Sequence, residues 1–277
     1  MRKAVPVLLG LTLALSACST APAPSATSQE AASQHQDTQH QGQRQVTMIL
    51  PDGTRQQVAA AVKDGYLMVE DDIIVAEAGA LTPQGTYVVD TRLRWGARTV
   101  PYTFASNVPQ AIRDRVAQAA STIRATTNVT VTPRTSSAQR DYVQITYNTG
   151  TSCASGLGKA GGRQTITLAD RCSTGSIIHE FGHTLGLFHE QTRPDRDRYV
   201  EIVWANIPAD WQSQYQIRSG SAGSGAYDFD SIMHYPAFFD GKLAIRPLDS
   251  SVDPNRMGQR NGYSPTDVGT INAMYPR

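Results

Sequence analysis

Three histidines fall within eleven residues in the segment HEFGHTLGLFH, residues 179–189. The whole chain has only six histidines in 277 residues. On a helix, residues four apart lie on one face about one turn apart, so His179 and His183 can direct their imidazoles at the same ion. Gly186 permits a left-handed backbone that ends a helix and turns the chain back. His189 can then supply a third nitrogen from the following loop.

This histidine cluster has the chemistry of a catalytic zinc site. Three neutral imidazoles leave a fourth coordination position open, which is typical of catalytic rather than structural zinc. Bound zinc lowers the pKa of water to about 7 and polarises a carbonyl oxygen. Glu180 lies roughly 100° around the helix from His179, close enough to contact a ligand of the ion and to act as a general base. We therefore expect one Zn²⁺ per chain. The competing interpretation, three histidines that merely pack at a helix end, does not account for the spacing.

The cluster requires a helix, and the hydrophobic pattern predicts one over residues 176–187. A second helix is expected from a cap at Asn107 to about Thr126, and a third from Pro265 to about Met274 with Ser264 as its N-cap. Short β-branched runs predict strands at Val100–Phe104, Val129–Thr132, Tyr142–Tyr147 and Gln164–Leu168. Strands, then a central helix, then an irregular half indicate an α+β protein.

The first residues have the pattern of an export signal. Two cations precede an apolar run from Ala4 to Ala17 that is too short to span a membrane. The residues Leu-Ser-Ala-Cys that end at Cys18 resemble the bacterial lipobox, so we expect a signal peptide over 1–17 and a lipid on Cys18. The alternative is a plain signal peptide with an incidental cysteine. The expected location is the outer membrane or the cell surface of a bacterium.

The amino-acid composition divides the chain after Cys18 into a polar segment and a segment that can form a core. Residues 19–45 contain no Val, Ile, Leu or aromatic residue, which predicts a disordered tether over 18–45. Order is expected from Val46, in a small unit with turns at residues 51–53 and 64–65 and an irregular stretch over 79–90.

Charge and cysteine content add two expectations. The formal net charge of +1 gives no electrostatic reason to propose a nucleic acid partner, and we expect a monomer. Apart from Cys18, the only cysteines are Cys153 and Cys172. In an exported protein such a pair is expected to form a disulfide rather than two buried thiols.

The motif around the histidines resembles that of the metzincins. Ser231-Ile232-Met233-His234-Tyr235 is similar to the methionine turn of that clan. Glu190 and the run RPDRDRY at residues 193–199 narrow the resemblance to the astacin family of zinc peptidases, over about residues 92–277. The resemblance implies a zincin-like fold, with an N-terminal twisted mixed sheet, an active-site helix and an irregular C-terminal subdomain. It also implies protein or peptide substrates.

The resemblance assigns further roles. Met233 would form a hydrophobic floor under the zinc. Tyr235 would be a fifth ligand at rest that swings away to hydrogen-bond the oxyanion when substrate binds. Glu190 would pair with the N-terminus freed by maturation, and His234 is expected to be structural. The strand Gln164–Leu168 would be the edge to which substrate adds antiparallel.

Residues 46–91 have the position of an astacin pro-segment. Val69-Glu70-Asp71-Asp72-Ile73 is similar to the family motif Phe-Glu-Gly-Asp-Ile. By that resemblance, Asp72 is a zinc ligand in the zymogen until cleavage between about Ala76 and Trp95. Asp71 replaces the glycine of the motif, which leaves open a hairpin whose acids only face solvent.

The chain departs from the family in one more respect. A second disulfide, running to the C-terminus, has no counterpart here, and Asn128 stands at one of its positions, so we expect lower stability. Arg256 and Arg260 lie near the loop that shapes the primed-side pocket, which favours acidic residues after the scissile bond. The leading hypothesis is a zinc-dependent endopeptidase. The alternatives are a catalytically silent binding module for peptides or envelope material, and a zinc hydrolase with non-peptide substrates.

Overall fold

The computed structural model describes residues 41–49, 55–77, 86–88, 94–218 and 225–277. The expected signal peptide, Cys18, most of the expected tether with His35 and His40, and the turn at residues 51–53 lie outside the described residues. Among the described residues, no helix has the length and apolar character needed to cross a bilayer.

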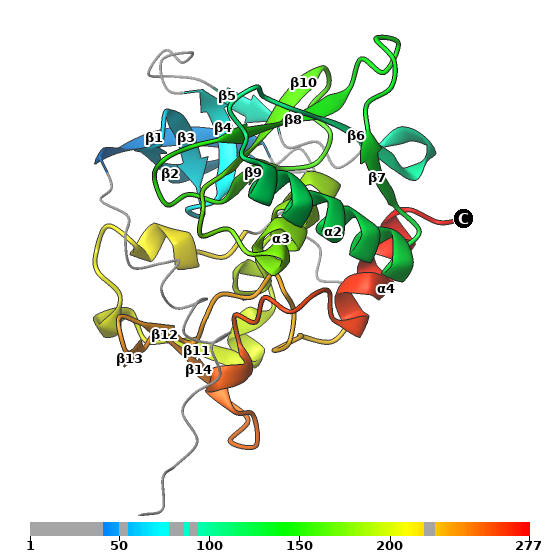
Figure 1. The fold of residues 1–277 in the computed structure, drawn as a ribbon. Helices are drawn as coiled ribbons and strands as arrows, with labels where there is room; N and C mark the ends of the chain where they lie inside the picture. Colours follow the sequence, from blue (N-terminus) through cyan, green and yellow to red (C-terminus); the bar gives the residue numbers. More distant parts are fainter. Residues whose placement is uncertain (1–40, 50–54, 78–85, 89–93, 219–224) are drawn as a thin grey trace, which may run out of the picture.

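One mixed sheet dominates the structure (Figure 1). Its ten strands lie in the order β5-β1-β2-β3-β4-β9-β10-β8-β6-β7. Their bounds are β1 Gln41–Ile49, β2 Arg55–Lys63, β3 Tyr66–Val69, β4 Ile73–Glu77, β5 Thr86–Val88, β6 Thr99–Phe104, β7 Thr130–Pro133, β8 Tyr142–Tyr147, β9 Ala154–Gly156 and β10 Arg163–Leu168.

The sheet has two halves of different character. Strands β6, β7, β8 and β10 pair in parallel, and β9 is antiparallel to β10. Strands β1 to β4 form consecutive antiparallel hairpins. The expected turn at Asp64-Gly65 joins β2 to β3, and both residues have the positive φ that a tight hairpin turn requires. The halves join where β4 pairs in parallel with β9.

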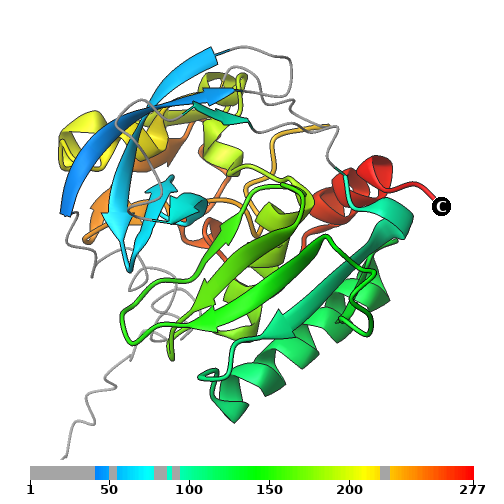
Figure 2. The ribbon, with the colours of Figure 1, turned by 90° about the horizontal axis from the view of Figure 1, so that it is seen from above.

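Helices α2 (Gln110–Thr126) and α3 (Thr174–Leu185) lie on one side of the parallel strands (Figures 1 and 2). The apolar stripe of α2 from Ile112 to Ile123 is buried, as the periodicity predicted. The expected cap at Asn107 is wrong: the N-cap is Pro109. The reason is that Val108 precedes a proline, which disfavours helical geometry at position 108, so the helix begins only after Pro109. The Asn107 amide instead donates to the carbonyl of Tyr147.

The C-terminal half is mostly irregular, as predicted. It contains two small antiparallel pairs, formed by β11 (Val200–Ile202) with β14 (Ile245–Pro247) and by β12 (Phe238–Phe239) with β13 (Lys242–Leu243). A separate aromatic core supports it, with Trp211, Tyr215 and Tyr235 among its members. The last helix, α4 (Pro265–Met274), begins with a capping box between Ser264 and Asp267.

Three expectations about the sheet need correction. Strand β1 begins at Gln41, inside the expected tether, because pairing with β2 uses backbone groups and tolerates polar side chains. Strand β5 lies inside the stretch expected to be irregular and pairs in parallel with β1. Strand β10 is not an edge strand, because it lies between β8 and β9. The strand on that side of β10 is the short β9, whose other side is covered by β4.

A disulfide and several hydrogen bonds join segments of residues 94–277 that are distant in the sequence. Cys153 and Cys172 are joined by a disulfide with a Cα–Cα distance of 5.8 Å. Asn128, at the position of the missing second disulfide, is hydrogen-bonded to the C-terminal region instead: its backbone N–H donates to Asn272 Oδ1 at 2.7 Å and its side chain donates to the carbonyl of Tyr275. Arg277 Nε in turn donates to Asn128 Oδ1. These bonds connect the same two regions without a covalent bridge.

Candidate active site

Helix α3 positions the first two histidines. It starts at Thr174, two residues earlier than the pattern predicted, because the Ser173 side chain accepts a hydrogen bond from Ser176 N and caps it. Gly186 ends the helix in the left-handed conformation with φ of 103°, as expected. All residues from Gly175 to Leu185 are buried, so α3 is a central core helix rather than a surface one.

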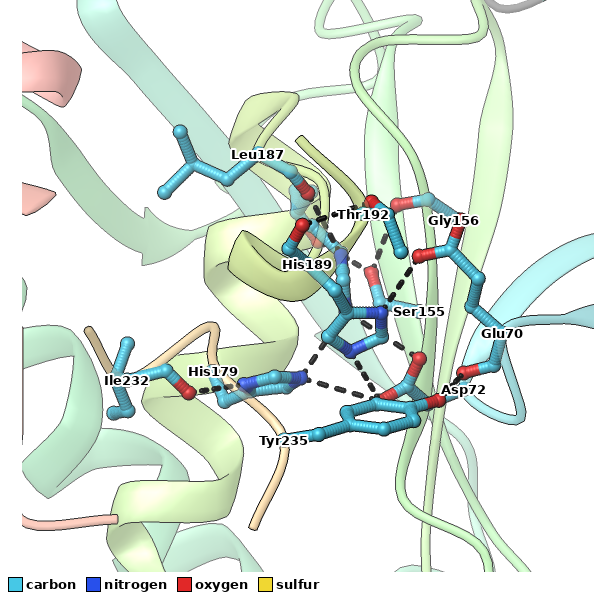
Figure 3. A network of polar contacts seen from close by, with 12 residues as sticks. Glu70, Asp72, Ser155, Gly156, His179, Leu187, His189, Thr192, Ile232 and Tyr235 are labelled. Carbon is cyan, nitrogen blue, oxygen red and sulfur yellow. Dashed lines mark hydrogen bonds and ion pairs between the residues drawn. The ribbon is translucent and has the colours of Figure 1, made fainter. Parts of the chain in front are cut away.

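The three histidines and one carboxylate converge on a single point (Figure 3). His179 Nε2 and His183 Nε2 are 3.1 Å apart. Asp72 Oδ2 lies 3.2 Å from His179 Nε2 and 3.1 Å from His189 Nε2. Asp72 Oδ1 lies 3.5 Å from His183 Nε2. The four residues form one group whose potential ligand atoms all lie within 4.8 Å of one another.

The outward-facing ring nitrogens are also fixed. His179 Nδ1 donates to the carbonyl of Ile232 at 2.7 Å, and His183 Nδ1 donates to the carbonyl of Leu187 at 2.8 Å. Because a carbonyl can only accept, both rings must carry their proton on Nδ1. This leaves each Nε2 with a lone pair directed at the shared centre, which is the tautomer a metal ligand needs.

The donor set fits a zinc ion. Two Nε2 lone pairs that face each other at 3.1 Å repel unless a cation lies between them. Burial opposes a positive charge on His189, yet Asp72 and Glu70 raise its pKa to about 9, so the centre favours positive charge. Asp72 Oδ1 is buried without a hydrogen-bond partner in the described part of the chain. Three imidazole nitrogens and one carboxylate oxygen are an accepted tetrahedral ligand set for Zn²⁺.

Glu180 lies beside this centre. Its side chain is buried, and Oε2 has no hydrogen-bond partner among the described residues. Burial, and then the charge of Asp72, raise the pKa of Glu180 well above its usual value, with Arg260 opposing the shift. Glu180 and His179 also line a small cavity. Asp71 and Asp72 from the N-terminal hairpins and Arg260 from the C-terminal half line the same cavity. A buried carboxylate next to a cavity, with one oxygen that has no hydrogen-bond partner among the described residues, can accept and return a proton.

Tyr235 is buried beside His189, with the two ring centroids 4.5 Å apart. Its hydroxyl donates to the carbonyl of Glu70 at 2.7 Å. With the N-terminal segment in place, the Tyr235 hydroxyl is therefore bound to that segment, as Figure 3 shows.

The methionine turn, residues 231–235, packs against helix α3. Met233 packs against α3 at Gly182, where an added Cβ would lie 2.5 Å from the methionine sulfur. The turn is held by Asp267, which accepts from Ser231 Oγ at 2.7 Å and from Ile232 N at 2.9 Å. Sequence analysis did not single out Asp267; its place at the start of α4, after Ser264, was the available signal.

Two other predicted residues lie away from the metal ligand atoms. Both ring nitrogens of His234 have protein partners, the Tyr227 hydroxyl and the Tyr235 carbonyl, which suits a structural role. Glu190 accepts hydrogen bonds from Arg193 and from Asp228 N. Burial raises the pKa of Glu190 to about 7 despite these donors. Its pairing with a new N-terminus stays a prediction.

In the turn that carries Asp72, Asp71 adopts the backbone geometry expected for the glycine that it replaces. Glu70 and Asp71 both have positive φ, 53° and 65°, so position 71 has the left-handed geometry in which glycine is favoured. Asp71 Oδ1 is paired with Lys63 Nζ at 3.2 Å in a buried ion pair. Sequence analysis missed Lys63, because its role depends on how β2 lies beside this turn.

The two primed-side arginines differ in their surroundings. Arg256 is half-exposed and paired with Asp230. Arg260 lines the cavity beside Glu180, but its Nη1 donates to the carbonyls of Ile232, His234 and Gln259. Arg260 therefore also supports the loop that orients His179.

Fold and site together define a metzincin-type zinc protein. The sequence model of the peptidase family described as Astacin matches residues 88–276. The chain belongs to the astacin family, as its motifs predicted.

Known proteins of this family resemble the chain over the same region. It is 37% identical to zinc metalloproteinase nas-13 of Caenorhabditis elegans over 71% of this chain, and 39% identical to nas-4 of the same organism over 66%. These matches span only 44% and 59% of those relatives. The structure of high choriolytic enzyme 1, a hatching enzyme zinc-protease of the medaka fish Oryzias latipes, superimposes with a TM-score of 0.59 at 32% identity. The superposition covers 66% of this chain and 92% of the hatching enzyme, and it confirms the predicted α+β fold.

Proposed function

We propose that this protein is a zinc-dependent endopeptidase and that Glu180 is its general base. The observation that carries the proposal is the convergence of three histidine Nε2 atoms beside a buried Glu180 oxygen that has no partner among the described residues. Family membership supports the same class of reaction. The substrates are proteins or peptides.

His179, His183 and His189 would hold the zinc ion, which when bound polarises the scissile carbonyl and acidifies water. Glu180 accepts a proton from the attacking water and returns it to the leaving amine. Burial of the Glu180 side chain favours the protonated carboxyl that donates in the second step. Met233 and Asp267 keep α3 and the methionine turn in register below the ligands.

Metal removal tests this proposal directly. We expect one zinc per purified chain and, after maturation, hydrolysis of a casein or peptide library. Chelation should abolish hydrolysis, and added Zn²⁺ should restore it. A silent binding module would bind peptides without cleaving them, and a non-peptide hydrolase would leave every peptide intact while turning over an ester. Either result would contradict the proposal.

Tyr235 is proposed to stabilise the transition state. In the matured enzyme its hydroxyl loses the Glu70 carbonyl and becomes available to the substrate. Tyr235→Phe should lower kcat by about 10- to 10³-fold, the range for loss of one oxyanion donor, with little change in KM. Steady-state kinetics on one peptide measure both. A change confined to KM would exclude this role.

The N-terminal segment is proposed to keep the enzyme latent. Strand β4 pairs with β9 in parallel, with Ile73 opposite Ser155, and Ser155 N donates to the Asp72 carbonyl at 2.8 Å. Strand β4 thus occupies the side of β9 to which an extended substrate would otherwise add, so the segment covers the site. The pro-segment would begin at β1 rather than at Val46 and would be removed by cleavage between about Ala76 and Trp95.

Export and anchoring are proposed from the N-terminal sequence alone. If Cys18 carries a lipid, radiolabelled palmitate should enter the wild-type protein in a bacterial host and should not enter Cys18→Ser. The variant should be found in the soluble fraction or remain unprocessed, because a single thiol supplies the acylation site. Equal labelling of the two proteins would refute the anchor and leave a plain signal peptide.

A further inference from the structure

The outer ring nitrogens of the three candidate zinc ligands are held in two different ways. His179 Nδ1 donates to the carbonyl of Ile232, and His183 Nδ1 donates to the carbonyl of Leu187. Both acceptors are backbone groups of the peptidase region, so they remain after maturation. The third ligand, His189, is hydrogen-bonded at Nδ1 to a side chain of the N-terminal segment (Figure 3). Removal of that segment would therefore change the surroundings of one ligand of the three.

That side chain is Glu70, which lies on the turn between β3 and β4. Its Oε2 accepts from His189 Nδ1 at 2.8 Å, and its Oε1 accepts from Arg218 Nε. The side chains of Glu70 and His189 are both fully buried. The carboxylate is thus held at both oxygens, with one of them directed at the imidazole. A histidine that donates one ring nitrogen to a carboxylate and offers the other to the metal is a common arrangement in zinc proteins.

His189 depends more on such a partner than the two ligands of helix α3 do. It lies in the loop after α3, at the start of the short 3-10 helix Glu190–Thr192, and side chains on loops are placed less precisely than side chains on helices. Its carbonyl accepts from Thr192 N at 3.1 Å and from Thr192 Oγ1 at 2.8 Å, which holds the backbone. The hydrogen bond to Glu70 fixes the ring itself and places the proton on Nδ1, so that Nε2 is free to bind metal.

We propose that Glu70 is a positioning residue for His189 and that the N-terminal segment thereby strengthens zinc binding by the uncut chain. Glu70 acts through His189, whereas Asp72 contacts the ligand group directly. Zinc is taken up by the uncut chain and is held less tightly after maturation. The proposal rests on the proposed zinc site and on removal of the segment, and it does not depend on peptidase activity.

The first test measures the zinc affinity of the full-length, uncut chain by competition with a chromophoric chelator. Every protein carries Glu180→Gln, so that no chain cleaves another. In this background Glu70→Gln should bind zinc about 10- to 100-fold more weakly, the usual cost of removing the outer partner of a metal ligand. Glutamine keeps the length of the side chain but removes the charge that strengthens the hydrogen bond. Equal zinc affinity with and without this substitution would overturn the proposal.

The matched control is Asp71→Asn, which removes one negative charge from the next residue of the same turn. Asp71 Oδ1 is paired with Lys63 Nζ, and asparagine tolerates the positive φ of this position. This variant should bind zinc more tightly than Glu70→Gln does. If both variants lose the same affinity, the effect comes from the overall charge near the site, and the proposal is wrong.

A second readout separates the contact with His189 from displacement of the whole segment. The zinc-loaded uncut chain is prepared with isotope-labelled histidine, and its ring N–H protons are observed by NMR. A hydrogen bond to a carboxylate is stronger than one to a neutral amide. Glu70→Gln should therefore shift the His189 Nδ1 proton upfield and leave the Nδ1 protons of His179 and His183 in place. If all three protons shift together, Asp72 has moved away from the ligands and Glu70 only docks the segment. That outcome, or an unchanged His189 proton, would contradict the positioning role.

The matured protein provides the third comparison. Limited proteolysis between residues 76 and 95, followed by removal of the released fragment, takes away Glu70 and Asp72 together. The matured protein should bind zinc at least about tenfold more weakly than the uncut chain. Equal affinity of the two forms would show that the segment does not assist metal binding. Because no substrate is used, these measurements decide the proposal even if no peptide is cleaved. Failure to cleave any peptide would count only against the proposed function.

Discussion

Glu180→Gln should retain about one equivalent of zinc and lose peptidase activity by roughly 10³-fold or more. Glutamine has nearly the same shape as glutamate but cannot accept a proton from water or return it to the leaving amine. General acid–base catalysis contributes about 10²- to 10⁴-fold, and a 10³-fold loss corresponds to about 4 kcal/mol in the activation barrier. Metal content and kcat/KM of the matured variant measure the two expectations separately.

The buried position of Glu180 makes this variant informative. Its Oε2 has no hydrogen-bond partner within the described ranges, so an amide at this position breaks no described bond of that atom, and the fold should be unaffected. Glu201→Gln, an exposed glutamate paired with Arg246, is the matched control and should keep full activity. Full activity in the Glu180 variant would rule out the proposed mechanism. Loss of zinc together with activity would show instead that Glu180 supports the metal site.

Asp72→Ala should make the uncut full-length chain an active peptidase. Asp72 contacts all three histidines, and its ionised form is favoured because His189 and His183 outweigh the cost of burial, which holds its pKa well below the usual value. Breaking a buried ion contact costs about 3–5 kcal/mol. Such a loss shifts the balance between the covered and the open site by roughly 10²- to 4 × 10³-fold. The assay compares uncut variant, uncut wild type and matured wild type on one peptide.

Asp71→Gly is the control for this experiment. It removes a neighbouring carboxylate and its ion pair with Lys63, but it also relieves a left-handed residue with φ of 65°. Relief of that geometry is worth about 1 kcal/mol, whereas loss of the buried pair with Lys63 is unfavourable. Latency should therefore weaken less in this variant than in Asp72→Ala, because the contacts of Asp72 with the three histidines remain. If the uncut wild type is as active as the matured enzyme, the segment does not inhibit the enzyme. If the two uncut variants are equally active, latency does not depend on Asp72.

Much of the metal site could be predicted from the sequence because its geometry is local. The spacing of His179 and His183 fixes two ligands on one helical face, and Gly186 fixes the turn that brings His189 back. Hydrophobic periodicity likewise predicted α2, and β-branched runs predicted the strands β6, β7, β8 and β10 though not their parallel pairing. Element ends were less accurate. The start of α3 depends on a single hydrogen bond to the Ser173 side chain, and α2 starts after Pro109 with no side-chain cap.

The pairing of the N-terminal strands β1 to β5 with the rest of the sheet could not be predicted from local sequence patterns. The residues of β10 do not indicate that β9 lies beside it or that β4 lies beside β9. Strand order is set by pairing between segments that are distant in the sequence. The motif at residues 69–73 indicated Asp72, but only the folded chain places Glu70 against His189 and Arg218, residues 119 and 148 positions away. The sequence by itself therefore determined the candidate metal ligands and the family to which the chain belongs. The tertiary structure alone decided which side chains cover the cleft, because those contacts arise from sheet pairing and burial between segments far apart in the chain.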